Sequence, residues 1–360
     1  AIFWVLLFVF VNITSVLYLG GLALQTIMGI PLLAGVIGLA IYASTFSIFG
    51  GLKAVVWTDV VQVVVLILGG LMASVLVLNA LGGSFFGGLE LLVERAPEKF
   101  DMILDKANPE YMNLPGISVL IGGMWIANLY YWGNNQYIIQ RALAAKSLQE
   151  AQNGTAFAAF LKILLPLIVV IPGIAAFVLQ ADINKPDEAY PWVLGNYVTV
   201  GFKGLAFAAL IAAIGSSLSS MVNSASTIFT LDIYQPFFMK KTGDNQSGLD
   251  SKEHDSSSMT HDEEKKLVLV GRLSAGLSLV LGIIVAPLLG NLDQAFQYIQ
   301  EYTGFISPGV VAVFLLGMFW KRTSTNAALA AVVLAIPLSA GFKFLLPQLP
   351  FLDRMGICFL

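Results

Sequence analysis

A chain of 360 residues in which 57% are hydrophobic and only 11% are charged does not have the composition of an ordinary water-soluble protein. It is expected to cross a membrane several times. The formal net charge of -3 gives no reason to expect a nucleic-acid partner. The one cysteine, Cys358, excludes a disulfide within the chain, and both histidines lie in one polar segment, so structural zinc is not expected.

Nine stretches are long and apolar enough to cross about 30 Å of hydrocarbon as helices. Helices are expected because a segment of this length must satisfy its backbone hydrogen bonds internally when it lies in lipid. The predicted spans are 1–28, 31–50, 54–82, 116–140, 153–180, 203–233, 266–290, 293–320 and 324–346, and a further span is expected to start near 351. Because both ends of the chain lie within apolar runs, we interpret it as an excerpt of a longer protein, with helices missing at both ends.

Lysine and arginine fall unevenly among the linkers, and this bias predicts the orientation. The side that receives Arg141 and the lysines near 240–266 is predicted to be cytoplasmic. The linkers 83–115 and 181–202, where acids outnumber bases, are then expected outside the membrane. The segment 235–265 is polar and mixed in charge, so it is predicted to be a disordered cytoplasmic loop.

Near the N-terminal end of the predicted span 54–82, Asp59 stands in the first turns of its helix. An acid there suits the positive end of the helix dipole, which is a sufficient structural explanation. The functional alternative is that an acid near the cytoplasmic mouth attracts a departing cation.

The segment 116–143 brings aromatic rings and amides into the membrane. Asn128, Tyr131 and Asn135 have the spacing of one helical face, and Trp132 flanks them. Such a face suits a neutral polyhydroxylated ligand, since a ring covers an apolar sugar face and an amide both donates and accepts hydrogen bonds. The alternative is an interfacial aromatic belt with helix-bridging amides. We favour this alternative for Trp132 and ligand contact for Asn128.

Lys162 lies about two and a half turns into its predicted helix. An ammonium at that depth is costly, so it is expected to face a polar cavity or a partner. Snorkelling of the long lysine stem toward the cytoplasmic interface is an equally good explanation.

Hydroxyl groups run through the middle of the membrane-length segment 204–234. Ala213, Ser216 and Ser220 recur at helical spacing, and a face of small residues lets neighbouring helices approach closely. The functional alternative concerns Ser216 and Ser217. Together with a backbone carbonyl near Ala213, they could offer several oxygens to one small, hard cation.

Gln300 belongs to a polar run, 294–309, in which Gly304 and the sequence Ser307-Pro308-Gly309 predict a bend. Its amide could complete the hydrogen-bonding shell of a ligand. Alternatively, it is a helix-end amide exposed outside the membrane or in a vestibule.

Taken together, these stretches resemble the sodium/solute symporter family, and most closely its bacterial sodium/galactose branch. The similarity covers nearly the whole chain. The motifs that carry it are YASTFSIFGGLKAVVWTD (42–59), ANLYYWGNNQYIIQRALAAK (127–146), AYPW (189–192), AAIGSSLSSMVNSASTIFTLDIY (212–234), GNLDQAFQYIQEYTGFISPG (290–309) and FLLGMFWKRTS (314–324).

The resemblance implies an all-α polytopic membrane protein whose residues 1–360 form one transporter domain. Its fold would be the inverted-repeat transporter fold of two five-helix repeats, here without its first core helices. The resemblance also implies residue roles: Asn128, Lys162 and Gln300 for sugar hydrogen bonds, Tyr131 for an aromatic inner gate, Ala213, Ser216 and Ser217 for sodium, and Asp59 for the sodium exit path.

The expected function is sodium-coupled symport of a galactose- or glucose-like sugar by alternating access in the plasma (inner) membrane. The expected partners are sodium, a small neutral sugar and the lipid bilayer, with no cofactor besides the coupling ion. No phosphate-binding loop and no nucleophile–base pair stands out, so neither an ATP-driven pump nor an enzyme is expected. The alternatives are sodium symport of an amino acid, a carboxylate or myo-inositol, and a transporter-like membrane sensor. The sequence does not indicate the oligomeric state.

Overall fold

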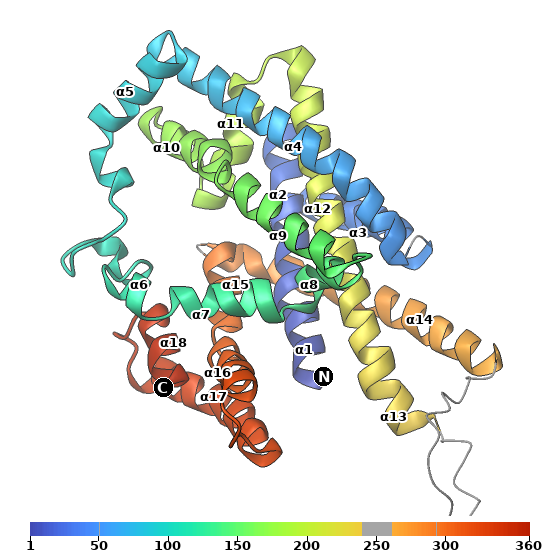
Figure 1. Ribbon diagram of the computed structural model, residues 1–360. Helices are drawn as coiled ribbons and strands as arrows, with labels where there is room; N and C mark the ends of the chain where they lie inside the picture. The colour runs from blue at the N-terminus through green and yellow to red at the C-terminus, as the bar shows by residue number, and fades with distance from the viewer. Residues whose placement is uncertain (50, 240–260, 293) are drawn as a thin grey trace, which may run out of the picture.

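The computed structural model describes residues 1–49, 51–239, 261–292 and 294–360, and within these ranges it consists of helices and connecting turns without a strand (Figure 1). The chain begins with one rod built from α1 (Ile2–Leu7), the π-helical η1 (Phe8–Ile13) and α2 (Thr14–Met28). The rod ends at Gly29, which adopts the left-handed conformation (φ 69°) that favours glycine.

Two long helices follow, α3 (Leu32–Phe49) and α4 (Gly51–Gly82), and α5 (Phe85–Arg95) folds back onto α4. The reversal uses Gly83 at φ 73° and Ser84, whose hydroxyl caps α5 by accepting from the Gly87 amide at 3.0 Å. The predicted linker 83–115 therefore contains α5 and two short 3₁₀ turns, η2 (Pro97–Phe100) and η3 (Pro109–Met112).

The segment 116–140 is not the single span that its apolar character predicts. It is divided into α6 (Ser118–Ile121), α7 (Met124–Leu129), the π-helical η4 (Tyr130–Asn134) and α8 (Gln136–Leu143). The first break lies at Gly122 and Gly123, where the backbone of Leu352 approaches so closely that a Cβ on Gly123 would lie 2.3 Å from its carbonyl oxygen. The second lies at Asn135, which is extended (ψ 116°).

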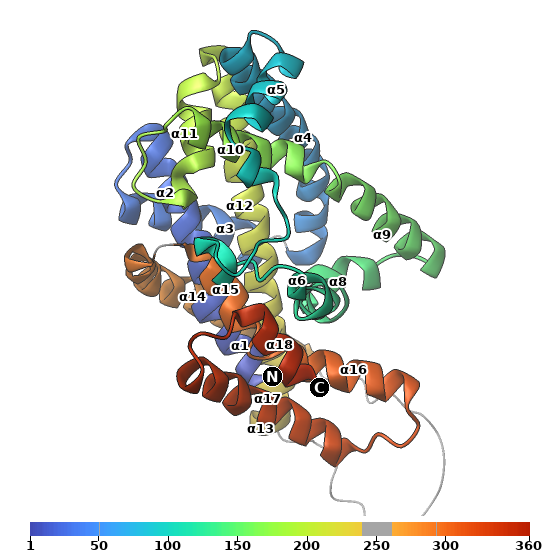
Figure 2. The same cartoon turned by 90° about the vertical axis from the view of Figure 1, so that its left-hand side faces the viewer.

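The next rod joins α9 (Leu148–Lys162), the π-helical η5 (Pro166–Val170) and α10 (Ile171–Val178), so the π-turn begins at a proline that cannot donate a helical hydrogen bond. Figure 2 shows α9 at the edge of the molecule, in agreement with its lack of buried residues. The predicted linker 181–202 contains η6 (Pro186–Glu188) and α11 (Ala189–Tyr197).

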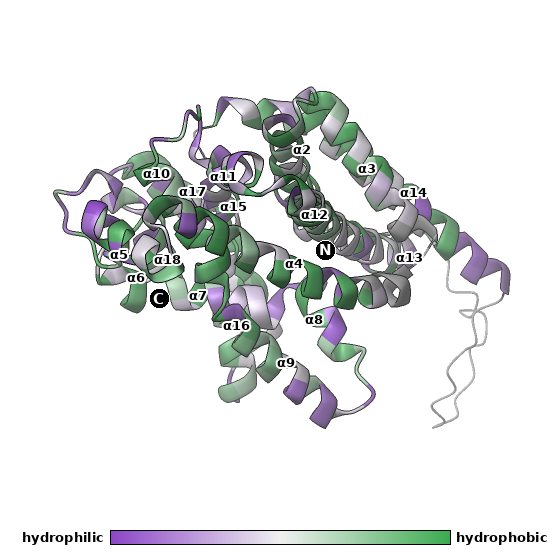
Figure 3. Cartoon of the chain, turned by 90° about the horizontal axis from the view of Figure 1, so that it is seen from above, coloured by the Kyte–Doolittle hydropathy of each residue, from purple (hydrophilic) through white to green (hydrophobic). Residues whose placement is uncertain are grey.

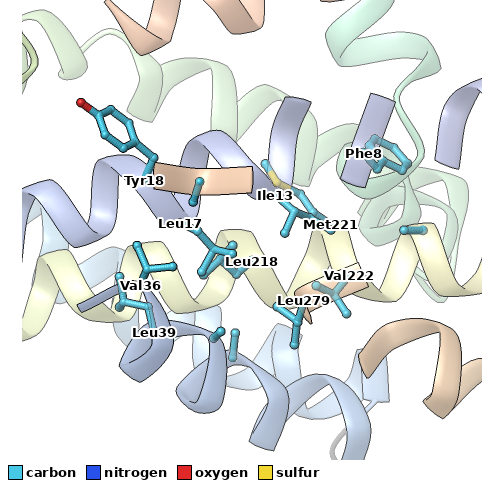
Figure 4. Packing of buried hydrophobic residues seen from close by; sticks show 14 of the residues in the cluster. Phe8, Ile13, Leu17, Tyr18, Val36, Leu39, Leu218, Met221, Val222 and Leu279 are labelled. Carbon is cyan, nitrogen blue, oxygen red and sulfur yellow. The ribbon is translucent and has the colours of Figure 1, made fainter. Parts of the chain in front are cut away.

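At the centre lies α12 (Val200–Ile228), which continues through η7 (Phe229–Tyr234) into α13 (Gln235–Phe238). Leu218, Met221 and Val222 of α12 pack against the first rod, α3 and α14, as Figure 4 shows. The other labelled members of this core are Phe8, Ile13, Leu17, Tyr18, Val36, Leu39 and Leu279. The small residues of α12 thus allow neighbouring helices to pack closely on several sides. This is the structural role that the sequence predicted for its face of small residues.

Both ends of the predicted loop 235–265 are helical rather than disordered, because α13 occupies its start and α14 (His261–Val285) begins before its end. Polar residues in the first turn of α14 suit a helix end outside the apolar layer, and Figure 3 shows this end in the hydrophilic colour. The rest of that prediction, residues 240–260, lies outside the described residues.

After η8 (Ala286–Asn291), the chain forms α15 (Ala295–Thr303) and α16 (Ser307–Phe319), whose axes differ by 47°. This confirms the bend predicted near Gly304. The chain ends with α17 (Thr325–Leu345) and α18 (Phe351–Phe359). Within the described ranges, six helical rods are long and apolar enough to span a membrane, or seven with the bent pair. This is fewer than predicted because 116–140 is broken and the apolar part of α3, Leu32–Thr45, is short.

The contact between α4 and α5 gives a prediction about stability. A Cβ on Gly88 would lie 2.2 Å from the Leu78 carbonyl oxygen, so Gly88→Ala is expected to destabilise the fold by about 1–3 kcal/mol. Gly173→Ala in α10 is the matched control, because nothing lies within 4 Å of its added methyl. It is expected to be neutral or to stabilise by about 0.5–1 kcal/mol. Thermal unfolding of the purified variants in detergent measures the stability of Gly88→Ala and of Gly173→Ala. Equal melting temperatures for the two variants would contradict the close contact between Gly88 and Leu78.

Candidate functional site

A cavity of about 400 Å³ lies between the broken helices and α12. Its lining includes all four residues that the sequence predicts for sugar binding and gating: Asn128 of α7, Tyr131 of η4, Lys162 of α9 and Gln300 of α15. Asn128 and Tyr131 come from consecutive elements, whereas Lys162 and Gln300 come from elements far from these and from each other in the sequence. Their roles as ligands stay predictions, but the fold brings them together at one site.

Helix interruptions supply much of this cavity wall. Asn12 comes from the π-helical turn η1, Tyr131 comes from η4, and Gln300 and Ser307 lie on opposite arms of the 47° bend. Irregular backbone in a membrane helix is tolerated where it faces a cavity or packed protein, and π-turns are frequent at functional sites. The interruptions therefore indicate a binding cavity more strongly than the polar residues alone do.

Asn128 and Tyr131 are both oriented by neighbours in their own segment. The Asn128 amide nitrogen donates to the Met124 carbonyl at 2.9 Å, one turn back in α7. The Tyr131 ring meets the Trp132 ring edge-on with centroids 5.2 Å apart and the Tyr137 ring edge-on with centroids 5.9 Å apart. An amide and an aromatic face are thus presented to the same space, as a sugar requires.

Lys162 is an exposed residue at the end of α9. Its ammonium lies 4.4 Å from the centroid of the Trp132 ring, within the range of a cation–π contact. It lines both the 400 Å³ cavity and a neighbouring cavity of about 680 Å³. This position fits both explanations left open by the sequence, a cavity-facing ammonium and a snorkelling lysine, and both stay predictions. Trp132, which we had assigned to an interfacial belt or helix bridge, also lines both cavities.

The three residues predicted to bind sodium lie beside these cavities. Ala213, Ser216 and Ser217 line a third cavity of about 780 Å³ between α4, α9 and α12. Ser217 lines all three cavities and so connects the predicted cation site with the predicted sugar site. Besides lining the cavity, Ser216 donates a hydrogen bond from its hydroxyl to the Asp59 carboxylate.

Asp59 lies at the centre of a charged network. Its Oδ2 accepts from Arg141 Nη2 at 2.5 Å and from Arg141 Nε at 2.9 Å, while its Oδ1 accepts from Ser216. The same guanidinium donates to Ser220 Oγ at 2.6 Å and to the Tyr137 carbonyl at 2.8 Å. Through these contacts, the Asp59 carboxylate links α4 to α8 and α12.

The helix-dipole explanation of Asp59 is wrong, because the first turn of α4 contains no acid and Asp59 lies farther along the helix. Arg141 is the partner that the sequence analysis missed. We had used Arg141 only as a marker of orientation, and its pairing with Asp59 joins residues 82 positions apart. Asn12 was also missed, although an amide within the apolar run 1–28 is a signal that the sequence itself carries.

Comparison with known proteins shows the family of this chain. The model of the sodium:solute symporter family matches residues 1–251 and 256–335. The chain belongs to the sodium:solute symporter family. It is a multi-pass membrane protein with the inverted-repeat transporter fold.

Individual members of the sodium:solute symporter family are also similar to the chain. A sodium/glucose cotransporter of Vibrio parahaemolyticus is 52% identical over 374 residues, covering 99% of this chain and 65% of the relative. A sodium/myo-inositol cotransporter 2 of Sus scrofa is 30% identical over 93% of this chain and 51% of its own length. The chain thus spans between half and two thirds of these relatives.

A solved structure supports the symporter fold. The substrate-bound, outward-open structure of a sodium-coupled sialic acid symporter matches with a TM-score of 0.75 over 99% of this chain and 71% of that chain. Sequence identity is 22%, so this likeness concerns the fold alone.

Proposed function

We propose that this protein is a sodium-coupled symporter for a small neutral sugar of the galactose or glucose type, working by alternating access. The observation that carries the proposal is that Asn128, Tyr131, Lys162 and Gln300 line one cavity, and that this cavity shares Ser217 with the predicted cation site. Similarity to a sodium/glucose cotransporter of Vibrio parahaemolyticus at 52% identity supports the choice of a sugar.

The proposed sugar site suits a neutral polyol in size and chemistry. A volume of about 400 Å³ falls in the range of small-molecule sites. Asn128 and Gln300 both donate and accept hydrogen bonds, and Tyr131 offers an aromatic face. The Lys162 ammonium, with its charge resting on Trp132, donates to a sugar hydroxyl without requiring an anion.

The proposed sodium site uses hydroxyl and carbonyl oxygens, which hard cations prefer. Ser216 and Ser217 contribute hydroxyls, and Ala213 a backbone carbonyl. Because Ser216 also donates to Asp59, an ion that leaves past Asp59 competes with Arg141 and Ser216 for the carboxylate. Because of this competition, Asp59 binds the departing sodium ion weakly and transiently on the exit path and is not one of its permanent ligands. We propose no cofactor besides the coupling ion.

The sodium gradient supplies the free energy. One charge that crosses about 100 mV releases about 2.3 kcal/mol, and about 1.4 kcal/mol corresponds to a tenfold concentration ratio. One sodium per sugar therefore supports a sugar gradient of roughly fortyfold from voltage alone. The proposed location is the plasma (inner) membrane.

A carboxylate solute is the second candidate, and Lys162 is the observation that favours it. An ammonium at the edge of the cavity would pair with an acidic substrate. Such a pairing predicts competition by an acidic sugar, whereas the primary proposal predicts competition by neutral hexoses and polyols.

The decisive experiment is uptake of radiolabelled galactose into proteoliposomes that contain the full-length protein. We expect uptake with an inward sodium gradient and none with a matched potassium gradient. Unlabelled neutral hexose is expected to compete, and an acidic sugar is not. Sodium-driven entry of another solute without galactose entry would contradict the choice of substrate, and sodium-independent uptake would contradict the coupling.

A further inference from the structure

The short helix α15 bears Gln300 and contacts the apolar clusters of the first rod through Ala295, Tyr298 and Ile299. Ala295 is its one fully buried hydrophobic residue among those whose burial is described, and the others are partly or largely exposed. Gln300 lines the cavity together with Ile299 and Thr303 of the same helix. Because most of these residues are only partly buried, the polar contacts at the two ends of α15 add to its restraint.

At its N-terminal end, α15 is bound by the segment that follows α10. Asp187 of η6 accepts from the backbone amide of Ala295 at 2.9 Å and so satisfies one of the unpaired amides at the helix start. Lys185 donates to the carbonyls of Gly290 and Leu292, the latter at 2.8 Å. Burial raises the pKa of Asp187, which agrees with a carboxyl enclosed against α15.

Near its C-terminal end, α15 is bound by two cations from α17 and α18. Glu301 Oε1 accepts from Arg354 Nη2 at 2.8 Å, and Glu301 Oε2 lies 3.2 Å from Lys343 Nζ. Arg354 is only 6% exposed, so its charge depends on this carboxylate for compensation. Lys343 also lies over the rings of Tyr302 at 4.8 Å and Phe305 at 5.8 Å.

We propose that Glu301, with its cations Arg354 and Lys343, and Asp187 are positioning residues that set the place of Gln300 in the cavity wall. This inference rests on the proposed role of Gln300 as a solute ligand. Glu301 is the residue next to Gln300, so a shift of its carboxylate moves the backbone that carries the ligand amide. Glu301 itself does not line the 400 Å³ cavity, so it acts through Gln300.

The electrostatics explain why an ion pair serves here. A buried ion pair adds little stability over an apolar contact, but it is specific in geometry because both charges must stay within hydrogen-bonding distance. Replacing Glu301 by glutamine keeps the size of the side chain and removes its charge. Arg354 then lies buried without compensation, and α15 loses the restraint next to Gln300.

The first test is sodium-driven solute uptake by the full-length protein with Glu301→Gln. We expect the KM for the solute to rise about tenfold, the equivalent of one lost charge-assisted contact, while the apparent sodium affinity at saturating solute stays the same. The matched control is Glu98→Gln on exposed η2, which is expected to behave as wild type. An unchanged KM, or a loss of folded protein and maximal rate alone, would mean that Glu301 is merely structural and would overturn the inference.

The second test does not depend on transport, so it separates a failure of this inference from a failure of the proposed function. Gln297→Cys is introduced one turn from Glu301 in a Cys358→Ser background, and the labelling rate with a hydrophilic maleimide is measured in detergent. Adding Glu301→Gln is expected to raise the rate severalfold, and an unchanged rate would overturn the inference even if transport is confirmed. If Glu301→Gln does not fold, Asp187→Asn serves as the second variant, with the same expectation and the same contradicting outcome.

Discussion

Replacing Ser217 by alanine is expected to abolish the stimulation of solute uptake by sodium. The change removes the one predicted cation ligand that lines all three cavities. Even changes outside the immediate ligands of a metal ion lower affinity by about 10–100-fold, so loss of a direct ligand is expected to cost at least as much. The measurement is initial uptake as a function of sodium concentration in proteoliposomes.

Ser219→Ala is the matched control for Ser217→Ala. Ser219 is also a buried serine of α12, but its hydroxyl donates to the Ala43 carbonyl at 3.3 Å and it lines none of the three cavities. Its variant is expected to keep the sodium dependence of wild type. If Ser217→Ala also kept that dependence, the assignment of the cation site to this part of α12 would be wrong.

Replacing Gln300 by alanine is expected to weaken sugar binding with a smaller effect on sodium. Each hydrogen bond between neutral groups contributes about 0.5–1.5 kcal/mol, so loss of an amide that makes two such bonds raises the KM for sugar by about 10–100-fold. Uptake at a range of galactose concentrations, with sodium saturating, measures the change.

Gln297→Ala is the control for Gln300→Ala, because Gln297 lies on the same short helix but does not line the 400 Å³ cavity. It is expected to leave the KM nearly unchanged. Equal losses of sugar and sodium affinity in Gln300→Ala would indicate a general disturbance of the site and would contradict a direct role in sugar binding.

The apolar runs predicted most helices because length and hydropathy act locally along the chain. The bend near Gly304 was predicted for the same reason, since glycine and proline disturb a helix wherever they occur. The breaks in 116–143 were not predicted. The first of them lies where Gly123 meets the backbone of Leu352, a contact between residues more than two hundred positions apart.

In the candidate site too, local features could be predicted from the sequence, whereas contacts between distant residues could not. Asn128, Tyr131, Lys162 and Gln300 are recognisable from sequence because polar groups in apolar helices are costly unless they face a cavity. The pairing of Arg141 with Asp59 is different, since many charged residues near helix ends have no partner beyond water. Only the fold places that guanidinium against α4 and α12, and it thereby gives Asp59 a partner that a helix-dipole argument does not supply.

The bend between α15 and α16 lies at Gly304, so any rotation of α15 about the bend would displace its residues in proportion to their distance from Gly304. At 1.5 Å per helical residue, Gln300 lies about 6 Å from Gly304 along the helix and Ala295 about 13 Å from it. A rotation of about 10° would then move Ala295 by about 2 Å and Gln300 by about 1 Å. Asp187 of the 181–202 segment therefore holds α15 at the end farthest from the bend, where a given rotation produces the largest displacement.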